Sequence, residues 1–210
     1  KAAVLYRKQA RFQLFTTGKI SQKNLLFEEQ HIERLRKASR YFAFLFDAED
    51  LKPKIEEECQ ACDANQDYRL RISLSKSGEI EVERRVLTPL SPSFCQAKLC
   101  LQEANLQQAF TYFKTSHRPH LSIGEQEKIY HNARGELLET SIGNLVLKIA
   151  GKLYTPPIRL GILPGIYRQH LLETGQVEEK VLTLADFAQA EAIYGCNAVR
   201  GLYELSVREN

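Results

Sequence analysis

Two short stretches in the second half of the chain decide the fold: Glu139-Thr140-Ser141-Ile142-Gly143-Asn144-Leu145 and, further along, Gly161-Ile162-Leu163-Pro164-Gly165-Ile166. The first places one acidic side chain in a polar, tightly turning segment. The second is a turn flanked by glycines, and its free backbone N–H groups can hold an anion. Upstream, Lys114 stands between an aromatic stretch and a polar turn. The sequence therefore offers a carboxylate, an anion cradle and an amine.

The composition is typical of a globular chain. With 210 residues and 43% hydrophobic content, the chain can bury a sizeable core, as one large domain or two small ones. No apolar run approaches the roughly 20 residues needed to cross a bilayer, and Lys1–Lys8 has too short an apolar stretch for a signal peptide. The net charge of +3 is spread along the chain. We therefore expect a cytoplasmic protein with no membrane or nucleic-acid partner.

The cysteines predict free thiols. They are odd in number, five, and widely spaced, which does not suit a disulfide framework in a chain of this size. Cys59-Gln60-Ala61-Cys62 has the spacing of a redox or zinc pair, but no second Cys pair or His cluster accompanies it. A structural role is therefore favoured for these cysteines, and no metal site is predicted.

Hydrophobic periodicity predicts two domains joined by a linker. The segment Thr88-Pro89-Leu90-Ser91-Pro92-Ser93 breaks both the helical and the strand period. We expect a smaller domain over 1–88, a linker over 89–94 and a larger domain over 95–210. In the first domain, strands are expected at 12–20, 24–27, 68–75 and 79–86, and helices at 28–46 and 51–61. In the second, strands are expected at 95–101, 128–131, 144–149, 152–155 and 192–196, and helices at 165–174 and 184–189.

Four stretches, taken in order, resemble the class IV, or fold type IV, pyridoxal phosphate enzymes. This family contains branched-chain aminotransferase, D-amino acid aminotransferase and 4-amino-4-deoxychorismate lyase. The resemblance covers nearly the whole chain, from Phe12 to about Leu205. It implies a two-domain α+β fold like that of D-amino acid aminotransferase, the cofactor pyridoxal 5'-phosphate, a small-molecule substrate and a homodimer. The four stretches are Leu14-Phe15-Thr16-Thr17, His31-Ile32-Glu33-Arg34-Leu35, 135–144 with Pro164-Gly165, and Cys196-Asn197-Ala198.

The resemblance implies roles for the lysine and the carboxylate. Lys114-Thr115-Ser116 is similar to the motif around the lysine that binds the cofactor covalently, and that lysine is also the catalytic base. Glu139 corresponds to the carboxylate that pairs with the ring nitrogen, so that the ring can accept electrons. Without the family, a lysine after aromatic residues is usually a strand end that reaches water, and Glu139 would cap a turn.

The phosphate group of the cofactor needs a cation and fixed N–H donors. Arg34 matches the family arginine that pairs with the phosphate; residue types alone would equally place it on a solvated helix face. Ile166 and Tyr167 match positions that offer backbone N–H groups at a helix start, and Asn197 and Ala198 match a second turn on the phosphate side.

The reaction implied is that of the lyase. Phe15-Thr16-Thr17 is similar to the Phe-Thr-Thr stretch of the lyase, in which Thr17 assists proton transfer, and Cys196-Asn197-Ala198 is similar to its Cys-Asn-Ala turn. Lys19 and Arg71 stand where cations bind the substrate, or are ordinary surface charges. The products would be 4-aminobenzoate, a folate precursor, and pyruvate, with an aminodeoxychorismate synthase as the supplier upstream. A class IV aminotransferase for branched-chain or D-amino acids and an inactive cofactor-binding homologue remain open.

The connector after Lys114 departs from the family pattern. The resemblance implies a longer helical connector, whereas this chain has only residues 115–123, and Pro119 disfavours a helix there. The pocket wall near this connector is therefore expected to be open, or the activity lost.

Overall fold

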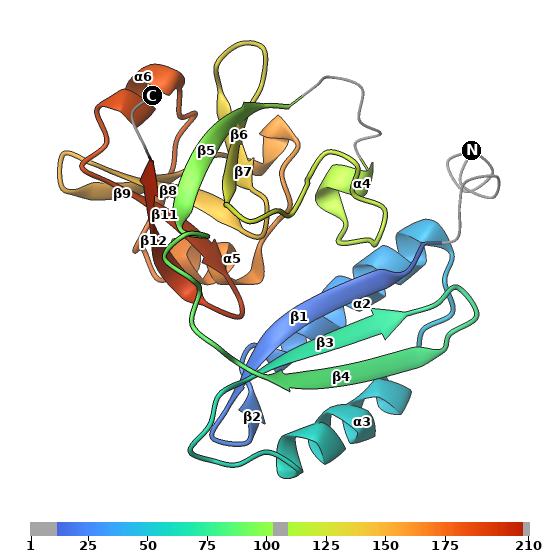
Figure 1. Ribbon diagram of the computed structural model, residues 1–210. Helices are drawn as coiled ribbons and strands as arrows, with labels where there is room; N and C mark the ends of the chain where they lie inside the picture. Colours follow the sequence, from blue (N-terminus) through green and yellow to red (C-terminus); the bar gives the residue numbers. More distant parts are fainter. Residues whose placement is uncertain (1–11, 103–108, 208–210) are drawn as a thin grey trace. The chain divides into compact units, whose positions relative to one another are not determined.

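The structure is a computed structural model that describes residues 12–102 and 109–207 (Figure 1). Backbone contacts divide the chain into two compact units. Within the described residues, unit 1 comprises 12–88 and Phe113–His117, and unit 2 comprises the remainder. The segment with Lys114 therefore belongs to unit 1, although the chain has by then entered unit 2. The expectation about Lys1–Lys8 lies outside the described residues.

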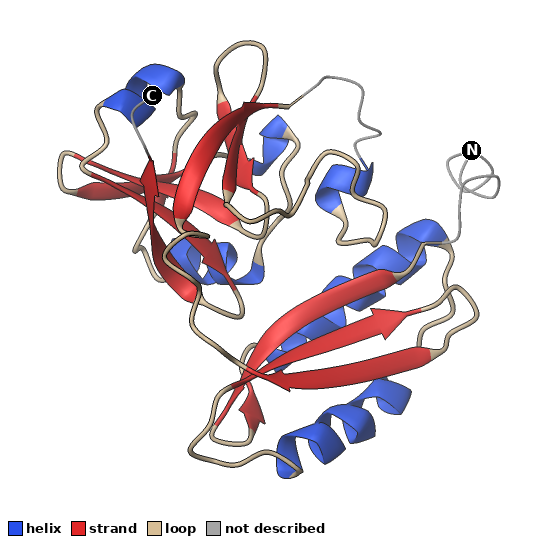
Figure 2. Cartoon of the chain, viewed as in Figure 1, coloured by secondary structure: helices blue, strands red, loops and turns tan. Residues whose placement is uncertain are grey.

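Unit 1 is a four-stranded antiparallel sheet, in the order β2-β1-β3-β4, with two helices on one face (Figure 2). Side chains alternate along β1, and every second one, such as Leu14 and Ile20, is fully buried on the helix side. An ion pair of 2.7 Å between Glu58 and Arg84 ties α3 to β4. The elements are β1 (Leu14–Ser21), β2 (Asn24–Leu25), α2 (Glu28–Phe42), α3 (Ala48–Gln60), β3 (Tyr68–Leu74) and β4 (Ile80–Val86).

Two elements of unit 1 are shorter than the sequence predicts. Helix α2 was expected to reach Phe46 but ends at Phe42, because Ala43 takes the left-handed conformation with a φ of 55°. The Phe44 N–H then bonds back to the Ser39 carbonyl at 2.9 Å, which closes the helix end. The strand expected at 24–27 is confined to β2, since Phe27 is also left-handed, with a φ of 59°.

Unit 2 is an eight-stranded sheet in the order β10-β9-β8-β11-β12-β5-β6-β7. Strand β7 also pairs with β8, through Glu139 and Asn144, so β8, β11, β12, β5, β6 and β7 close into a barrel (Figure 1). Apolar side chains fill its core, including Ile129, Leu145 and Leu205. The strands are β5 (Gln96–Leu101), β6 (Lys128–His131), β7 (Leu137–Thr140), β8 (Asn144–Ile149), β9 (Lys152–Thr155), β10 (Glu178–Glu179), β11 (Ala192–Asn197) and β12 (Gly201–Val207).

The helices of unit 2 are short. Helix α5 starts directly after Gly165, and α6 opens with a capping box in which Thr183 and Asp186 bond to each other's backbone. Both were predicted, and each ends within a residue of its expected end. The helices are α4 (Ala109–Tyr112), α5 (Ile166–Glu173), α6 (Leu184–Ala188) and the 3-10 turn η2 (Ile158–Leu160).

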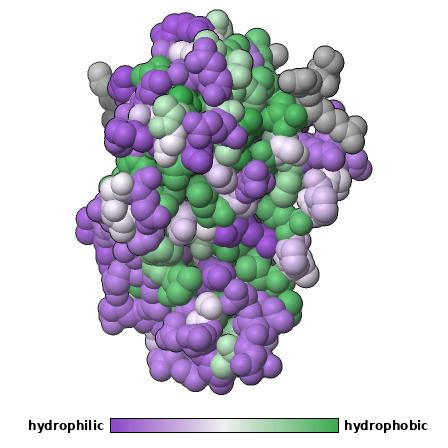
Figure 3. Space-filling model, turned by 90° about the vertical axis from the view of Figure 1, so that its left-hand side faces the viewer, coloured by the Kyte–Doolittle hydropathy of each residue, from purple (hydrophilic) through white to green (hydrophobic). Residues whose placement is uncertain are grey.

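The lower part of Figure 3, at the height of α3 in Figure 1, is mostly hydrophilic, with some apolar residues among the polar ones. None of the helices in the described residues has the length and apolar character needed to cross a membrane. Within the same residues, no group of His, Cys, Asp or Glu side chains could hold a metal ion. All five cysteines are free thiols, as the sequence predicts.

Candidate active site

The predicted substrate residues of unit 1 share one face of its sheet. Phe15, Thr17 and Lys19 occupy the β1 positions that point away from α2 and α3, and all three are half-buried. The antiparallel register places Arg71 of β3 directly opposite Thr17. Directly opposite residues in neighbouring strands present their side chains on the same face. Thr17, Lys19 and Arg71 are therefore brought together on the open face.

Lys114 is attached to the same face. Its carbonyl accepts a hydrogen bond of 3.0 Å from the Phe15 N–H, and the Ser116 N–H donates to the Gln13 carbonyl at 2.8 Å, so this segment pairs with β1. The Lys114 Nζ lies 5.0 Å from the centre of the Phe15 ring. The Arg71 Cζ lies 4.0 Å from the centre of that ring. Two cations thus flank one aromatic ring beside Thr17.

Lys19 already has an acidic partner. Its Nζ forms an ion pair of 3.0 Å with Asp67. A substrate carboxylate at this position would have to share the ammonium group with Asp67. Arg71, whose guanidinium donates to the Ser73 hydroxyl through Nε at 3.2 Å, keeps further N–H donors for a ligand.

Arg34 lies on α2, one helical turn after the buried His31. The His31 ring, which is fully buried, bonds through Nδ1 to the Thr16 hydroxyl at 2.6 Å. Burial, with smaller contributions from the positive charges of Arg34 and Lys114, lowers the pKa of His31 to about 3. The imidazole is therefore neutral, and Arg34 and Lys114 are close enough for both charges to act on it.

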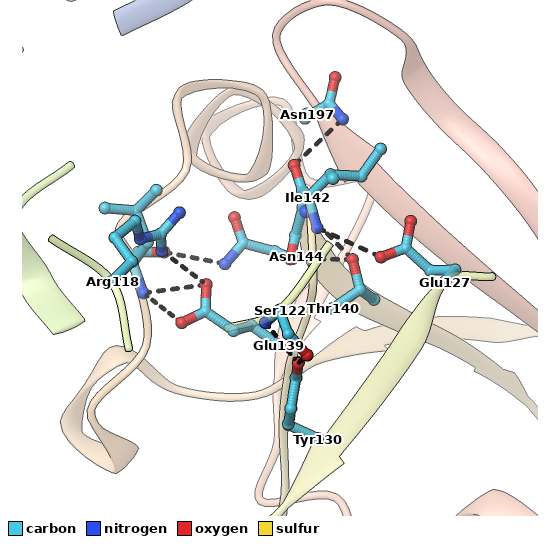
Figure 4. Close-up of polar contacts among 11 residues, drawn as sticks. Arg118, Ser122, Glu127, Tyr130, Glu139, Thr140, Ile142, Asn144 and Asn197 are labelled. Carbon is cyan, nitrogen blue, oxygen red and sulfur yellow. Dashed lines mark hydrogen bonds and ion pairs between the residues drawn. The ribbon is translucent and has the colours of Figure 1, made fainter. Parts of the chain in front are cut away.

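Glu139 of unit 2 is buried where the barrel closes. Only 2% of this residue is exposed. Both carboxylate oxygens lie 3.4 Å from the Leu163 N–H, and Oε2 lies 3.7 Å from the Arg118 guanidinium (Figure 4). The sequence prediction of a carboxylate beside the Pro164-Gly165 turn is thus matched in space, because Leu163 immediately precedes that turn.

Hydrogen bonds fix the hairpin that follows Glu139. The Thr140 N–H donates to the Gly143 carbonyl at 2.9 Å, and the Gly143 N–H donates to the Thr140 hydroxyl at 3.0 Å. A Cβ at Gly143 would lie 2.5 Å from the Cys196 carbonyl oxygen, so only glycine fits. The Asn144 side chain donates to the Leu163 carbonyl at 2.8 Å. The hairpin and the Pro164-Gly165 turn are therefore held as one piece.

The two predicted phosphate turns both belong to unit 2. Helix α5 begins at Ile166 and has no side-chain cap at Gly165, so the backbone N–H groups of Ile166 and Tyr167 are at its positive end. A Cβ at Gly201, just after the second turn, would lie 3.4 Å from the Tyr167 hydroxyl. The Tyr167 side chain therefore reaches from the start of α5 to the residue where β12 begins, just after the second turn.

Asn197 shapes the second turn with its side chain. Its Oδ1 accepts from the N–H groups of Val199 and Arg200, at 3.0 and 2.9 Å, and its Nδ2 donates to the Ile142 carbonyl at 3.3 Å (Figure 4). Ala198, in the same turn, is 9% exposed. The side chain of Asn197 is thus engaged with the protein, and any contact of this turn with a ligand would come from its backbone.

Glu127 is a buried carboxylate that the sequence analysis missed. It accepts from the Ser141 hydroxyl at 2.5 Å, the Ile142 N–H at 3.2 Å and the Tyr203 hydroxyl at 3.3 Å. Burial raises its pKa, against the opposing effect of these hydrogen bonds. Glu127 supports the hairpin after Glu139. Glu127 follows Gly-Glu-Gln, a run that is typical of an exposed loop, so the sequence pattern does not predict that Glu127 is buried.

Comparison with known proteins gives related sequences of low identity. A Haemophilus influenzae protein named "Uncharacterized protein" is 33% identical over 79 residues, which are 38% of this chain and 41% of that protein. The match thus spans less than half of this relative. A Schizosaccharomyces pombe protein named "Putative aminodeoxychorismate lyase" is 23% identical over 161 residues, covering 71% of this chain and 68% of that protein.

The fold matches a solved structure across almost its whole length. A "Putative amino-acid aminotransferase" from Mesorhizobium loti superposes with a TM-score of 0.79 and 25% identity, covering 94% of this chain and all of that one. The expected α+β fold of type IV is thereby confirmed. The family model described as "Amino-transferase class IV" matches residues 13–206. The chain therefore belongs to the class IV amino-transferase family, whose members are pyridoxal phosphate enzymes.

Proposed function

We propose that this chain is a pyridoxal phosphate dependent 4-amino-4-deoxychorismate lyase, which releases 4-aminobenzoate and pyruvate. The observation that carries the proposal is the shared face of unit 1, where Thr17 lies opposite Arg71 and next to Phe15, whose ring lies close to both Arg71 and Lys114. That face combines a hydroxyl, a lysine and cations. These groups suit an acidic substrate that must lose a proton.

The residues of unit 2 fit the cofactor. Glu139 is a buried acidic group suited to a ring nitrogen, and the Gly165–Tyr167 helix start offers N–H groups to a phosphate. Arg118, beside Glu139, keeps buried nitrogens without a hydrogen-bond partner, which is unusual for a protein interior that holds no ligand. When bound, pyridoxal phosphate supplies an electron sink for bond cleavage at the substrate carbon.

Each residue has a separate task in the proposal. Lys114 would hold the cofactor covalently, and its Nζ would remove the proton at C4 of the substrate. Glu139 would keep the ring nitrogen protonated. Arg34 in unit 1, and the start of α5 and the Asn197-Ala198 turn in unit 2, are the groups that the resemblance assigns to the phosphate. Arg71 and Lys19 bind the substrate carboxylates. The Thr17 hydroxyl assists proton transfer to or from the substrate. The departing enolpyruvyl group takes up a proton to become pyruvate.

The reaction type is tested by supplying aminodeoxychorismate, made in situ from chorismate and ammonia by a synthase. We expect 4-aminobenzoate and pyruvate without any added 2-oxo acid. Thr17→Val should reduce this turnover far more than it weakens cofactor binding, because it removes a hydroxyl and keeps the shape. Thr17→Ser is the matched control and should keep most of the turnover.

An aminotransferase is the second candidate, favoured by the similarity to the Mesorhizobium loti structure. Product that forms only when a 2-oxo acid and an amino acid donor are present would establish this alternative. Bound cofactor without either reaction would identify an inactive homologue.

The proposed active protein is a homodimer, because the class IV enzymes that this chain resembles build their sites at a two-fold interface. Light scattering of the purified protein should give twice the chain mass of 24.1 kDa. A monomer with full activity would contradict this part of the proposal.

A further inference from the structure

The short connector after unit 1 folds into a defined turn in unit 2. The Leu121 N–H donates to the Arg118 carbonyl at 3.1 Å, and the Ser122 N–H donates to the Tyr130 hydroxyl at 2.9 Å. Leu121 also packs against a cluster of Tyr130, Leu138 and Ile162. The connector is therefore anchored on β6 and β7, directly beside Glu139.

This anchoring brings one cation into the interior. The side chain of Arg118 is 14% exposed and that of Glu139 is 3% exposed, and their charged groups are 3.7 Å apart (Figure 4). Two nitrogens of Arg118, Nε and Nη2, are buried without a hydrogen-bond partner. Burial lowers the pKa of Arg118, and the charge of Glu139 partly offsets that effect. At this distance the two groups form an ion pair through their charges.

We propose that Arg118 is a positioning residue for Glu139: it keeps this buried carboxylate ionised and oriented in the cofactor-free protein, ready for the proton of a ring nitrogen. The role given to Glu139 in this inference rests on the proposed function. The evidence for the action of Arg118 is the ion pair between the two side chains. A buried carboxylate without a counter-ion takes up a proton instead of staying charged. Among the contacts that hold Glu139, the two from the Leu163 N–H are long, at 3.4 Å, and Arg118 supplies the cation.

The proposal has a consequence for proton uptake. If Glu139 is ionised before the cofactor binds, it can pair with a ring nitrogen that arrives already protonated, and no proton needs to be exchanged with solvent. If Arg118 is replaced by a neutral side chain, Glu139 already carries a proton, and that proton must be released when the protonated ring binds. The number of protons taken up on cofactor binding should then fall by about one per site.

The first experiment measures the ionisation of Glu139 in the cofactor-free protein. The carboxyl carbon signal is followed by NMR as a function of pH and identified by its loss in Glu139→Gln. In Arg118→Met, which removes the charge but keeps the length, the affinity of Glu139 for a proton should rise at least about tenfold, because charge neutralisation by Arg118 is lost. Arg118→Lys, which keeps the charge, should restore the pH midpoint of the Glu139 titration to its wild-type value. If Arg118→Met does not fold, Arg118→Gln, which also removes the charge, takes its place in this measurement.

Arg134→Met is the matched control. Arg134 forms an ion pair of 2.6 Å with Glu136 near the same strand, but its side chain is 74% exposed. Its loss should leave the Glu139 midpoint unchanged. If Arg118→Met also leaves that midpoint unchanged, Arg118 does not hold the carboxylate ionised and the inference is overturned.

The second experiment measures proton uptake by calorimetry, adding pyridoxal phosphate in buffers of different ionisation enthalpy. The measurement is made at about pH 6, which is above the usual pKa range of a glutamate and below the pKa expected for a buried glutamate without a counter-ion. At this pH, wild type and Arg118→Lys should take up about one proton more than Arg118→Met. Equal uptake in all three would overturn the inference. If no cofactor binds, the proposed function fails, whereas the NMR midpoint still decides the role of Arg118.

Discussion

The two units hold their candidate residues in different ways. In unit 1, Thr17, Lys19, Arg71 and Lys114 project from a sheet face that its own helices leave uncovered, and all four are half-buried. In unit 2, Glu139 is buried and the neighbouring turns present backbone groups fixed by hydrogen bonds. The candidate residues of unit 1 are thus adjustable side chains, whereas those of unit 2 belong to a rigid frame.

This difference predicts which substitutions change the chemistry and which change the fold. Long side chains on an open sheet face contribute little packing, so their removal should spare stability. Backbone turns packed against other backbone atoms tolerate no added atom, so a single methyl group should be costly there. Ligand groups are held most accurately when rigid elements position them.

The largest expected effect follows from removing the amine in unit 1. Lys114→Ala should abolish the covalent adduct that borohydride fixes between protein and cofactor, and should lower turnover by about 10⁴-fold, the upper range for loss of a general base. The fold should persist, because the backbone bond between Lys114 and Phe15 remains. The adduct is measured by mass spectrometry. Lys19→Ala, on the same face, is the control and should keep the adduct. An undiminished adduct in Lys114→Ala would remove this lysine from the site.

A smaller effect is expected for the carboxylate of unit 2. Glu139→Gln should keep the cofactor bound but slow proton removal by about 10²–10³-fold, since the neutral amide no longer holds the ring nitrogen protonated. Single-turnover rates followed by cofactor absorbance would measure this. Glu136→Gln, in the same strand region but with its carboxylate paired to the exposed Arg134, is the control. Unchanged rates in Glu139→Gln would exclude a role for this carboxylate.

The rigid frame itself is tested at Gly143. A Cβ there would lie 2.5 Å from a backbone oxygen of Cys196, and backbone cannot move aside cheaply. Gly143→Ala should therefore lower the free energy of unfolding by about 1–3 kcal/mol. Gly124→Ala, where a Cβ would meet nothing within 4 Å, is the matched control and should be nearly neutral. Denaturant unfolding compares the two. Equal stabilities would show that the hairpin after Glu139 is not rigid.

The sequence predicts most regular elements of this fold, but neither β12 (Gly201–Val207) nor the closure of the barrel. The strands Lys128–His131 and Asn144–Ile149 lie where alternation and turn residues place them. Strand β7 was not predicted, because Leu137–Thr140 is short and buried at all four positions, so it has no alternation to detect. Its pairing with β8 closes the barrel and positions Glu139. Such a pairing depends on tertiary contacts.

The candidate site shows the same division. Family motifs selected Lys114 and Glu139, whose roles remain predictions. They could not select Arg118 or Glu127, because burial of an ionisable side chain depends on which segments pack over it. The early end of α2 was likewise hidden, since Phe44 and Phe46 continue an apolar pattern that the left-handed Ala43 interrupts. Local sequence thus indicates elements and chemistry, whereas packing determines which charges are buried.

The pH dependence of stability should also distinguish the two units. The pKa of His31 in unit 1 is lowered from 6.5 to about 3, so the unfolded chain binds the proton first as pH falls. Its contribution to stability should therefore decrease by about 1.4 kcal/mol for each pH unit below 6.5, down to about 3.

Glu127 in unit 2 should act in the opposite direction. Its pKa is raised above 4.5 by burial, so the folded chain keeps the proton to higher pH, and stability decreases as pH rises from 4.5 through the folded pKa. Unfolding in urea between about pH 4 and 7, across the range where both groups titrate in the unfolded chain, compares His31→Gln and Glu127→Gln. The first substitution should reduce the loss of stability on acidification, and the second should reduce the loss on raising the pH. The amide in each variant is neutral, so only the proton-linked part of stability is removed. If either variant keeps the wild-type slope, the corresponding group does not titrate with unfolding, and the contrast between the lowered pKa of the imidazole in unit 1 and the raised pKa of the carboxyl in unit 2 is lost.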